Sequence, residues 1–330
     1  MKNFNFVLGV DVSKKTLDIC CCRLGLHIRV DNNDKGFMAF KKWSKENHID
    51  LVRTLVVMEY TGGYEYCFLQ YCESISLDYC RVPGLEIKCS TGMARGKSDR
   101  TDSYRIGRYG EEKLDILAPA KPLNKAILLL KQYLSFRKRL VRENAGLKST
   151  IKERKHMYGS KDTEPIVAIC LKKIAANERD ILKIEKQIIS MIESNEEMRQ
   201  NYQLLTSIKG VGNINAWMAM AYTENFESFT DARKYAVAVG VIPFEHTSGT
   251  SIKGRKRVSH IANKEVKQEL NQAAKSAMVH DPQIRAYAER KLRDKAYPLV
   301  LNNVKFKLIL RMFAVVKRKQ KYVENYIKAA

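Results

Sequence analysis

Four acidic residues near the start of the chain have the types and spacing needed to bind a metal ion. Asp11 lies inside the apolar run 6–12, and Glu59 ends a second apolar run, 55–59. Both runs have the length and composition of buried strands, where an unpaired carboxylate is costly. Asp99 and Asp102 are three residues apart, which places both on one face of a starting helix. Since four adjacent carboxylates repel and hard oxygen ligands favour Mg²⁺ or Mn²⁺, the sequence predicts a divalent-metal site.

The elements that position these acids alternate between strand and helix. Strands are predicted at about 5–12, 17–24, 27–31, 54–60 and 77–82, and the second and third form a hairpin around Gly25. Helices are predicted at about 36–47 and 64–75. This order matches the ribonuclease-H-like fold, in which a central sheet carries acids at strand ends and on a late helix. The predicted class is therefore α/β in the first part of the chain and α beyond it.

Long helices are predicted after Pro119 and Pro122, at 123–157 and 165–198. In the second helix Ile174, Ile181 and Ile188 recur every seven residues, with Ile184 and Met191 between them and Asn177 interrupting the seam. Two interpretations stay open. The seam closes a helical hairpin within the chain through the turn at 158–162, or it forms a coiled coil between subunits.

A glycine turn lies near the start of the last part of the chain. Residues 204–216 predict a helix, a tight turn at Gly210 and Gly212, and a second helix. Such a turn can present backbone N–H groups to a phosphate, although it can equally be a plain helix–helix connection. Lys209 and the basic surroundings favour contact with nucleic acid.

A hydroxyl-rich loop is predicted after Gly240, at 246–257. It contains Thr247, Ser248 and Gly249, followed by the cations Lys253, Arg255, Lys256 and Arg257. A serine in such a loop is suited to attack a phosphodiester, because the cations stabilise the charged transition state. Taken alone, these residues favour a phosphate-binding loop whose hydroxyls only donate hydrogen bonds.

The positive charge is concentrated in two blocks. The chain of 330 residues carries 59 Lys and Arg against 36 Asp and Glu, a net charge of +23. Residues 81–160 hold 19 basic and 8 acidic residues and residues 241–330 hold 20 and 7, whereas residues 1–80 and 161–240 are close to neutral. Two basic blocks predict a protein that contacts a polyanion twice.

The cysteine pattern and the hydropathy argue against a disulfide-linked, a zinc-binding or a membrane-spanning protein. The eight cysteines form no Cys-x-x-Cys pair and fall mostly in apolar stretches, which indicates reduced thiols and not a disulfide framework or a zinc site. No signal peptide is recognised and no apolar stretch reaches 18 residues, so we expect a bacterial cytosolic protein, associated with the nucleoid, without a membrane span.

Five short motifs in order resemble one known family across nearly the whole chain. They are Gly9-Val-Asp11-Val-Ser-Lys, Met58-Glu59-Tyr-Thr-Gly-Gly-Tyr, Lys97-Ser-Asp99-Arg-Thr-Asp102-Ser, Ile208-Lys-Gly-Val-Gly and Gly240-Val-Ile-Pro with Thr247-Ser248-Gly249. The chain resembles the DEDD-type transposases of the insertion-sequence-110 type, whose N-terminal half is similar to the RuvC resolvase fold.

The resemblance implies a site and partners. Asp11, Glu59, Asp99 and Asp102 would form the catalytic metal-binding tetrad, and Ser248 would be the nucleophile that forms a covalent serine–DNA linkage. The implied cofactor is Mg²⁺ or Mn²⁺. The implied partners are donor DNA, target DNA, a structured noncoding guide RNA that pairs with both, and further copies of this chain. The residues expected to bind nucleic acid are Lys97, Arg100, Lys209, Gly210, Gly212, Thr247, Gly249, Lys253, Arg255, Lys256 and Arg257.

Three expected parts follow: a RuvC-like domain at 1–118, a helical coiled-coil segment at 119–200 and a C-terminal transposase domain at 201–330. The chain departs from the family pattern at Ser103, where alanine is more common, at Lys209, where proline is common, and at 260–264. The alternatives to a recombinase are a structure-specific nuclease that uses water, with the serine loop only binding phosphate, and a binding scaffold that lacks activity.

Overall fold

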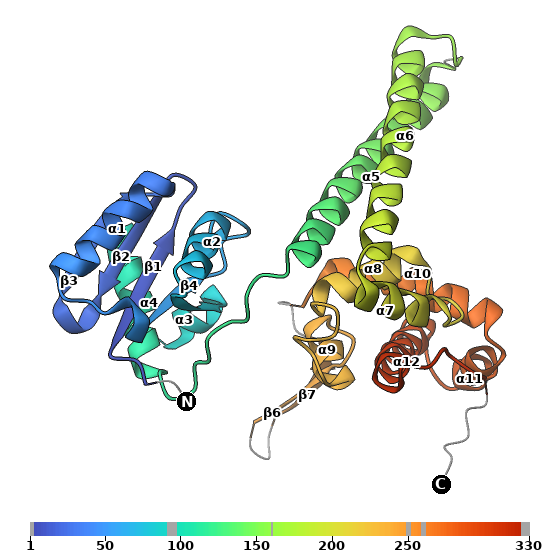
Figure 1. Cartoon of the computed structure of the whole chain (residues 1–330). Coiled ribbons are helices and arrows are strands. Elements are labelled where there is room, and N and C mark those ends of the chain that lie inside the picture. The colour runs from blue at the N-terminus through green and yellow to red at the C-terminus, as the bar shows by residue number, and fades with distance from the viewer. Residues whose placement is uncertain (1–2, 91–97, 160, 249–251, 259–261, 325–330) are drawn as a thin grey trace. The chain divides into compact units, whose positions relative to one another are not determined.

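The computed structural model describes residues 3–90, 98–159, 161–248, 252–258 and 262–324, and for residues 244–257 it describes the backbone alone (Figure 1). The chain divides into two compact units, Met1–Leu123 and Asn124–Ala330. The first unit is a mixed α/β structure and the second is mainly helical. The long helical pair therefore belongs to the same compact unit as the C-terminal helices.

A five-stranded sheet of order β3-β2-β1-β4-β5 forms the first unit. The strands are β1 (Phe6–Val12), β2 (Thr16–Cys21), β3 (Leu26–Asp31), β4 (Thr54–Glu59) and β5 (Asp78–Val82). β1, β2 and β3 pair antiparallel, whereas β4 is parallel to both β1 and β5. The predicted strands are confirmed within a few residues, as is the hairpin at Gly25 (φ 65°). The strand predicted at 17–24 ends at Cys21, since Cys22–Leu24 form a 3-10 turn that reverses the chain.

Helices cover both faces of this sheet. α1 (Asp34–Glu46) and α2 (Tyr66–Ser74) pack on one face, where Leu8 and Val10 of β1 meet Phe37, Phe40 and Phe68. α3 (Gly84–Ser90) and α4 (Asp99–Glu112) pack on the other, through a core that includes Val7, Val57, Ile87, Ile106 and Tyr109. Successive strand residues thus alternate between the two cores, as a strand buried on both faces requires.

Glycines allow α4 to lie unusually close to β1. A Cβ atom at Gly9 would lie 2.1 Å from the backbone nitrogen of Gly107 and 2.2 Å from the carbonyl oxygen of Ser103. Further along the helix, a Cβ at Gly110 would lie 2.7 Å from Val7 Cγ1. Because backbone atoms cannot move aside, only glycine fits at position 9, and this contact fixes where α4 begins over the sheet.

α5 (Lys125–Tyr158) and α6 (Pro165–Glu193) form an antiparallel helical hairpin. The ion pairs Arg137–Glu185 (2.7 Å) and Arg154–Glu164 (2.9 Å) join the two helices, and the pair later in α5 uses the earlier residue of α6. Asn177 Nδ2 donates to Asn144 Oδ1 at 2.8 Å across the hairpin. The heptad seam therefore packs within the chain, in agreement with the interpretation as an intramolecular helical hairpin.

The helix predicted at 165–198 is shorter than expected. α6 ends at Glu193, and the Asn195 side chain accepts a hydrogen bond from Met198 N, which caps a new helix, α7 (Glu196–Thr206). Asn is a strong N-cap residue, so the break has a local cause that the apolar periodicity concealed.

The remaining helices of the second unit surround one core. They are α8 (Asn213–Tyr222), α9 (Ala232–Ala238), α10 (Lys264–His280), α11 (Pro282–Leu292) and α12 (Tyr297–Arg318), and the core includes the buried side chains of Trp217, Tyr235 and Leu308. β6 (Phe244–Ser248) and β7 (Ile252–Arg257) extend from this unit as a two-stranded antiparallel ribbon. The prediction of a loop at 246–257 is wrong for the described residues, because 246–248 and 252–257 belong to the paired strands β6 and β7. No helix among the residues with described positions is long and apolar enough to cross a membrane.

Candidate active site

Asp11, Glu59 and Asp18 share one face at one end of the sheet. Asp11 lies on the face that packs under α4, because Gly9, two residues earlier, contacts that helix. Asp18 of β2 is the cross-strand partner of Asp11, so the two side chains point to the same side. Glu59 lies two residues after Val57, which packs under α4, so the Glu59 side chain points to the same face. It comes directly after Met58, which pairs with Val10 of β1.

The first turn of α4 brings the other two acids to this edge. Asp99 is the first residue of the helix and Asp102 the fourth, so both lie in the first turn as the sequence predicted. Ser98 caps the helix by accepting a hydrogen bond from Thr101 N at 3.2 Å. The acidic side chains suit this position, because the N-terminus of a helix carries partial positive charge.

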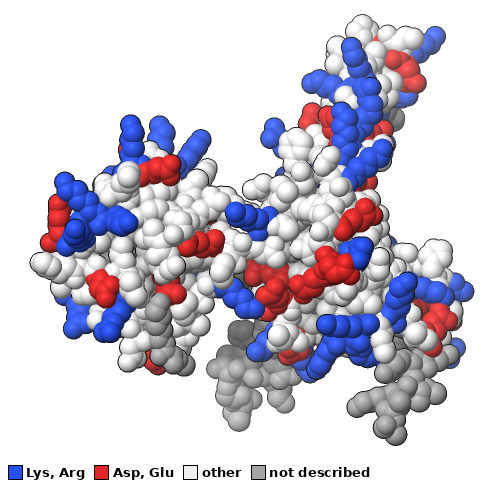
Figure 2. Space-filling view, viewed as in Figure 1, with Lys and Arg blue, Asp and Glu red and all other residues white. Residues whose placement is uncertain are grey.

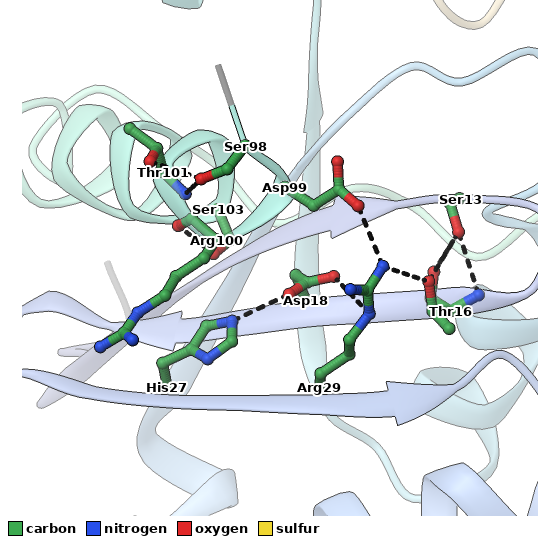
Figure 3. Close-up of polar contacts among 10 residues, drawn as sticks. All are labelled: Ser13, Thr16, Asp18, His27, Arg29, Ser98, Asp99, Arg100, Thr101 and Ser103. Carbon is green, nitrogen blue, oxygen red and sulfur yellow. Dashed lines mark hydrogen bonds and ion pairs between the residues drawn. The ribbon is translucent and has the colours of Figure 1, made fainter. Parts of the chain in front are cut away.

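Arg29 of β3 connects the sheet to α4 (Figure 3). Its guanidinium lies 3.4 Å from Asp18 Oδ2 and 3.0 Å from Asp99 Oδ2. Asp18 also contacts His27 Nε2 at 2.9 Å, and Asp102 pairs with Arg105 at 3.0 Å. Asp18 is 3 % exposed, so His27 and Arg29 supply the partners that a buried carboxylate needs. Asp11 and Glu59 have no such partner among the described residues.

The surroundings of Asp11 raise its pKa to about 6. Burial is the largest cause, followed by the charges of Asp102, Asp99, Asp18 and Glu59. Each of these carboxylates lies close enough to disfavour a negative charge on Asp11. The edge of the sheet is therefore a region of concentrated negative potential, as a site for a cation requires.

The acids surround this edge without forming a closed ligand cluster. In the described part of the chain, no three His, Cys, Asp or Glu side chains are arranged to hold a metal ion. Glu59 packs against Gly84 at the start of α3, where a Cβ atom would lie 1.8 Å from Glu59 Oε1. The donor set is nonetheless the hard oxygen set that Mg²⁺ and Mn²⁺ prefer, and a bound cation would offset the repulsion at Asp11.

Asp18, His27 and Arg29 were not predicted from the sequence as residues of this site. A signal was available, since Asp18 interrupts the apolar run 17–21 just as Asp11 interrupts 6–12. Its position directly opposite Asp11 depends on the hairpin register, which the sequence alone did not supply.

Ser248 belongs to the second unit, where it is the last residue of β6 and pairs with Ile252. Thr247 pairs with Lys253, and Arg255, Lys256 and Arg257 follow along β7. Gly249 and Lys97 lie outside the described residues. Arg100 is exposed on α4 next to Asp99, and Figure 3 shows its side chain directed away from the Asp18–Arg29 contact.

The glycine turn packs against the protein itself. Gly210 has φ +91°, and a Cβ there would lie 2.7 Å from the carbonyl oxygen of Ala273 in α10. Lys209 forms an ion pair with Glu324. Gly212 is the N-cap of α8 and leaves open space at its Cα. The close packing of Gly210 accounts for the glycine without a phosphate, so the helix–helix connection is the better-supported interpretation there.

Basic side chains gather on the helical unit. Figure 2 shows Lys and Arg along the α5–α6 hairpin and over part of the surface formed by the C-terminal helices. The exposed cations of the hairpin include Arg142, Lys148, Lys152, Lys155, Lys172, Lys173 and Arg179. Such a distribution favours binding of a polyanion by the second unit.

Two family models match separate parts of the chain. The family described as "Transposase IS116/IS110/IS902 family" matches residues 202–289, and a DEDD-type IS110 family described as "Transposase" matches residues 8–154. Two curated relatives are each named "Pilin gene-inverting protein". The one from Moraxella bovis is 26% identical over 270 residues and the one from Moraxella lacunata 25% over 270, each match covering 80% of this chain and 80% of the relative.

Proposed function

Since the chain belongs to the insertion-sequence-110 family of transposases and site-specific DNA recombinases, we propose that it cuts and rejoins DNA with a divalent metal at the acidic edge and Ser248 as nucleophile. The relatives' name, a gene-inverting protein, supports recombination of DNA as the activity. The single observation that carries the metal assignment is the convergence of Asp11, Glu59, Asp99 and Asp102 on one edge of the sheet.

The first unit would hold the metal. Asp11, Glu59, Asp99 and Asp102 would supply carboxylate oxygens, and the bound ion would polarise the phosphate and stabilise the leaving oxygen. Arg29 forms an ion pair with Asp99 at 3.0 Å and orients this carboxylate. We propose a ribonuclease-H-like fold for this unit, supported by the strand order, the antiparallel β1–β3, the parallel β4 and β5, and the acids at strand ends and on α4.

Ser248 would attack the phosphorus atom of the scissile phosphodiester. Its Oγ forms the new bond to phosphorus while the 3′ oxygen of the DNA leaves and takes up a proton. The resulting serine–DNA linkage keeps the phosphodiester energy, so a second 3′ hydroxyl can displace the serine and rejoin the strand. The cations of β7 lie next to this strand in sequence and pairing, where they would stabilise the charged transition state.

A covalent trap tests the nucleophile. Wild-type protein incubated with end-labelled element DNA and Mg²⁺ should yield a denaturation-resistant protein–DNA species. Ser248→Ala should abolish it, whereas Ser251→Ala, three residues later in the sequence, should retain it. Cleavage by Ser248→Ala with wild-type rate would show that water is the nucleophile and that the protein is a structure-specific nuclease.

Substitution of the central acid tests the metal site. Asp11→Asn should retain DNA binding and lose cleavage, because a neutral amide binds the cation weakly. Asp34→Asn, an exposed acid at the start of α1, is the matched control and should cleave normally. Full activity of Asp11→Asn would remove Asp11 from the site.

The remaining proposals concern partners. A guide RNA from the same element would bind the two basic blocks, and it should copurify with the protein from the native host and be released by high salt. We further propose a homo-oligomer, because strand exchange between two duplexes needs several active sites. The exposed apolar residues Ile166 and Ile169 of α6 support such contacts. A monomeric mass with bound nucleic acid would contradict it.

A further inference from the structure

Lys305 of α12 is buried without a counter-charge. Its relative exposure is 4 %, and it lies on a helix whose buried side chains are otherwise apolar. In the part of the chain that the structure describes, no acidic side chain pairs with it and no hydrogen bond reaches it. Buried lysines are rare unless paired, because leaving water costs free energy.

A second lysine faces it from a neighbouring helix. Lys267 of α10 lies close enough for its charge to lower the pKa of Lys305, and burial lowers the pKa of both ammonium groups. α10 and α12 pack against each other over an extended contact. Two cations kept adjacent, both partly removed from water and unpaired among the described residues, form a site that an anion would complete.

The ammonium of Lys305 is not wholly enclosed. The fully buried, unpaired side-chain atoms of the described residues belong to Asn32, Tyr71, Arg81, Trp217 and Tyr235, and Lys305 Nζ is not one of them. With 4 % of the residue exposed, the aliphatic stem is buried and little of the side chain meets solvent. A phosphate oxygen would contact Nζ at this exposed end.

The helices that carry the two lysines also carry residues that contact the chain on either side of the β6–β7 segment. Before β6, the Val241 carbonyl accepts a hydrogen bond from Asn302 Nδ2, one turn before Lys305 on α12. After β7, Asn263 N donates to the Ala238 carbonyl at 3.0 Å, and Asn263 is one turn before Lys267 on α10. Each lysine therefore occupies the same helix face as a residue that anchors one end of the β6–β7 segment.

We propose that Lys267 and Lys305 form a binding site for one backbone phosphate of DNA, at the base of the ribbon that carries Ser248. The Asn263-capped N-terminus of α10 adds partial positive charge on the same side. The assignment to DNA rests on the proposed function, because Ser248 would act on a DNA strand. A phosphate held here fixes the position of that strand relative to β6.

Salt dependence of DNA binding tests the site in the full-length chain. Fluorescence anisotropy with a labelled duplex DNA gives the slope of log affinity against log salt, which changes by about 0.9 for each phosphate contact. Lys305→Met and Lys267→Met should each weaken binding on the order of tenfold at ~0.1 M salt and reduce the slope by about one. The double variant should resemble the single variants, because both lysines hold the same phosphate.

Two exposed lysines on the same helices, Lys275 of α10 and Lys317 of α12, are matched references. Lys275→Met and Lys317→Met report what any exposed lysine of this basic block contributes, and each should lower the slope by less than Lys305→Met or Lys267→Met does. Equal slopes for Lys305→Met, Lys267→Met and these controls would overturn the site. A loss confined to a labelled single-stranded RNA of equal length would overturn the assignment to DNA. If the wild type binds no DNA at all, the proposed function fails, whereas an unchanged Lys305→Met in a protein that binds DNA refutes only this site.

Discussion

Neutralising Asp11 should stabilise the metal-free first unit. The pKa of Asp11 is raised from 3.8 to about 6, through burial and through the neighbouring carboxylates. The unfolded chain therefore loses this proton at lower pH than the folded chain does. Stability falls as the pH rises between these values, and the full cost is present above pH ~6. At ~1.4 kcal/mol per pKa unit the shift corresponds to about 3 kcal/mol, and because Asp11 is partly exposed and solvent screens its neighbours, we expect a cost of about 1–2 kcal/mol.

Asp11→Asn removes this cost, so the variant should be more stable than wild type by about 1–2 kcal/mol at pH 7. Below pH ~4 the aspartate is protonated in both states and the difference should vanish. Hydrogen exchange of the buried β4 amides (Thr54–Glu59) in the full-length protein reports unfolding of this unit without a further mutation. Asp34→Asn serves as the control and should change stability by less than ~0.5 kcal/mol.

Addition of Mn²⁺ should make wild type more stable than Asp11→Asn. A cation that binds the folded state alone stabilises it by about 2.7 kcal/mol at one hundred times its dissociation constant. Wild type should gain this protection, whereas Asp11→Asn should gain much less. The electrostatic argument would be refuted if Asp11→Asn and wild type were equally stable at pH 7 without metal. It would also be refuted if their difference in stability were the same at pH 4 as at pH 7. Equal protection by Mn²⁺ in both proteins would refute the role of Asp11 in metal binding.

Three further predictions concern packing and buried charge. Gly9→Ala should destabilise the first unit by at least ~2 kcal/mol, because the added methyl group meets the α4 backbone. Gly146→Ala on α5, where the methyl group meets nothing within 4 Å, should stabilise the protein by ~0.5–1 kcal/mol, and urea unfolding measures both changes. Asn177→Ala should cost about 1–2 kcal/mol by leaving buried Asn144 unpaired, and Leu at both positions should recover most of this loss in the same assay. Lys305→Met should stabilise the second unit by at most about 3 kcal/mol at pH 7, because the folded pKa is lowered to about 8 and wild type bears that cost below pH 8. The gain should decline between pH 8 and 10.5, and an equal gain at pH 11 would contradict it.

Local patterns predicted most of the elements of the first unit. Apolar runs located β1, β2, β3, β4 and β5, and Gly25 located the hairpin, because strand length, alternation and turn chemistry are local properties. The end of α6 was missed because a cap at Asn195 outweighed a continuing apolar pattern. The segment 246–257, most of which forms β6 and β7, was predicted as a loop, because glycine and serine are as typical of loops as of short hairpins.

The sequence by itself determined which four acids form the candidate site, their order on strand and helix, and the resemblance of the chain to one family of transposases. These depend on residue type and spacing along the chain. Tertiary structure decided that Asp18 lies opposite Asp11, that Arg29 holds Asp99, and that Gly9 admits α4 against β1. It also decided that Lys267 and Lys305, thirty-eight residues apart in sequence, lie near each other on two packed helices. Register and helix packing depend on contacts between distant segments, which no local pattern encodes.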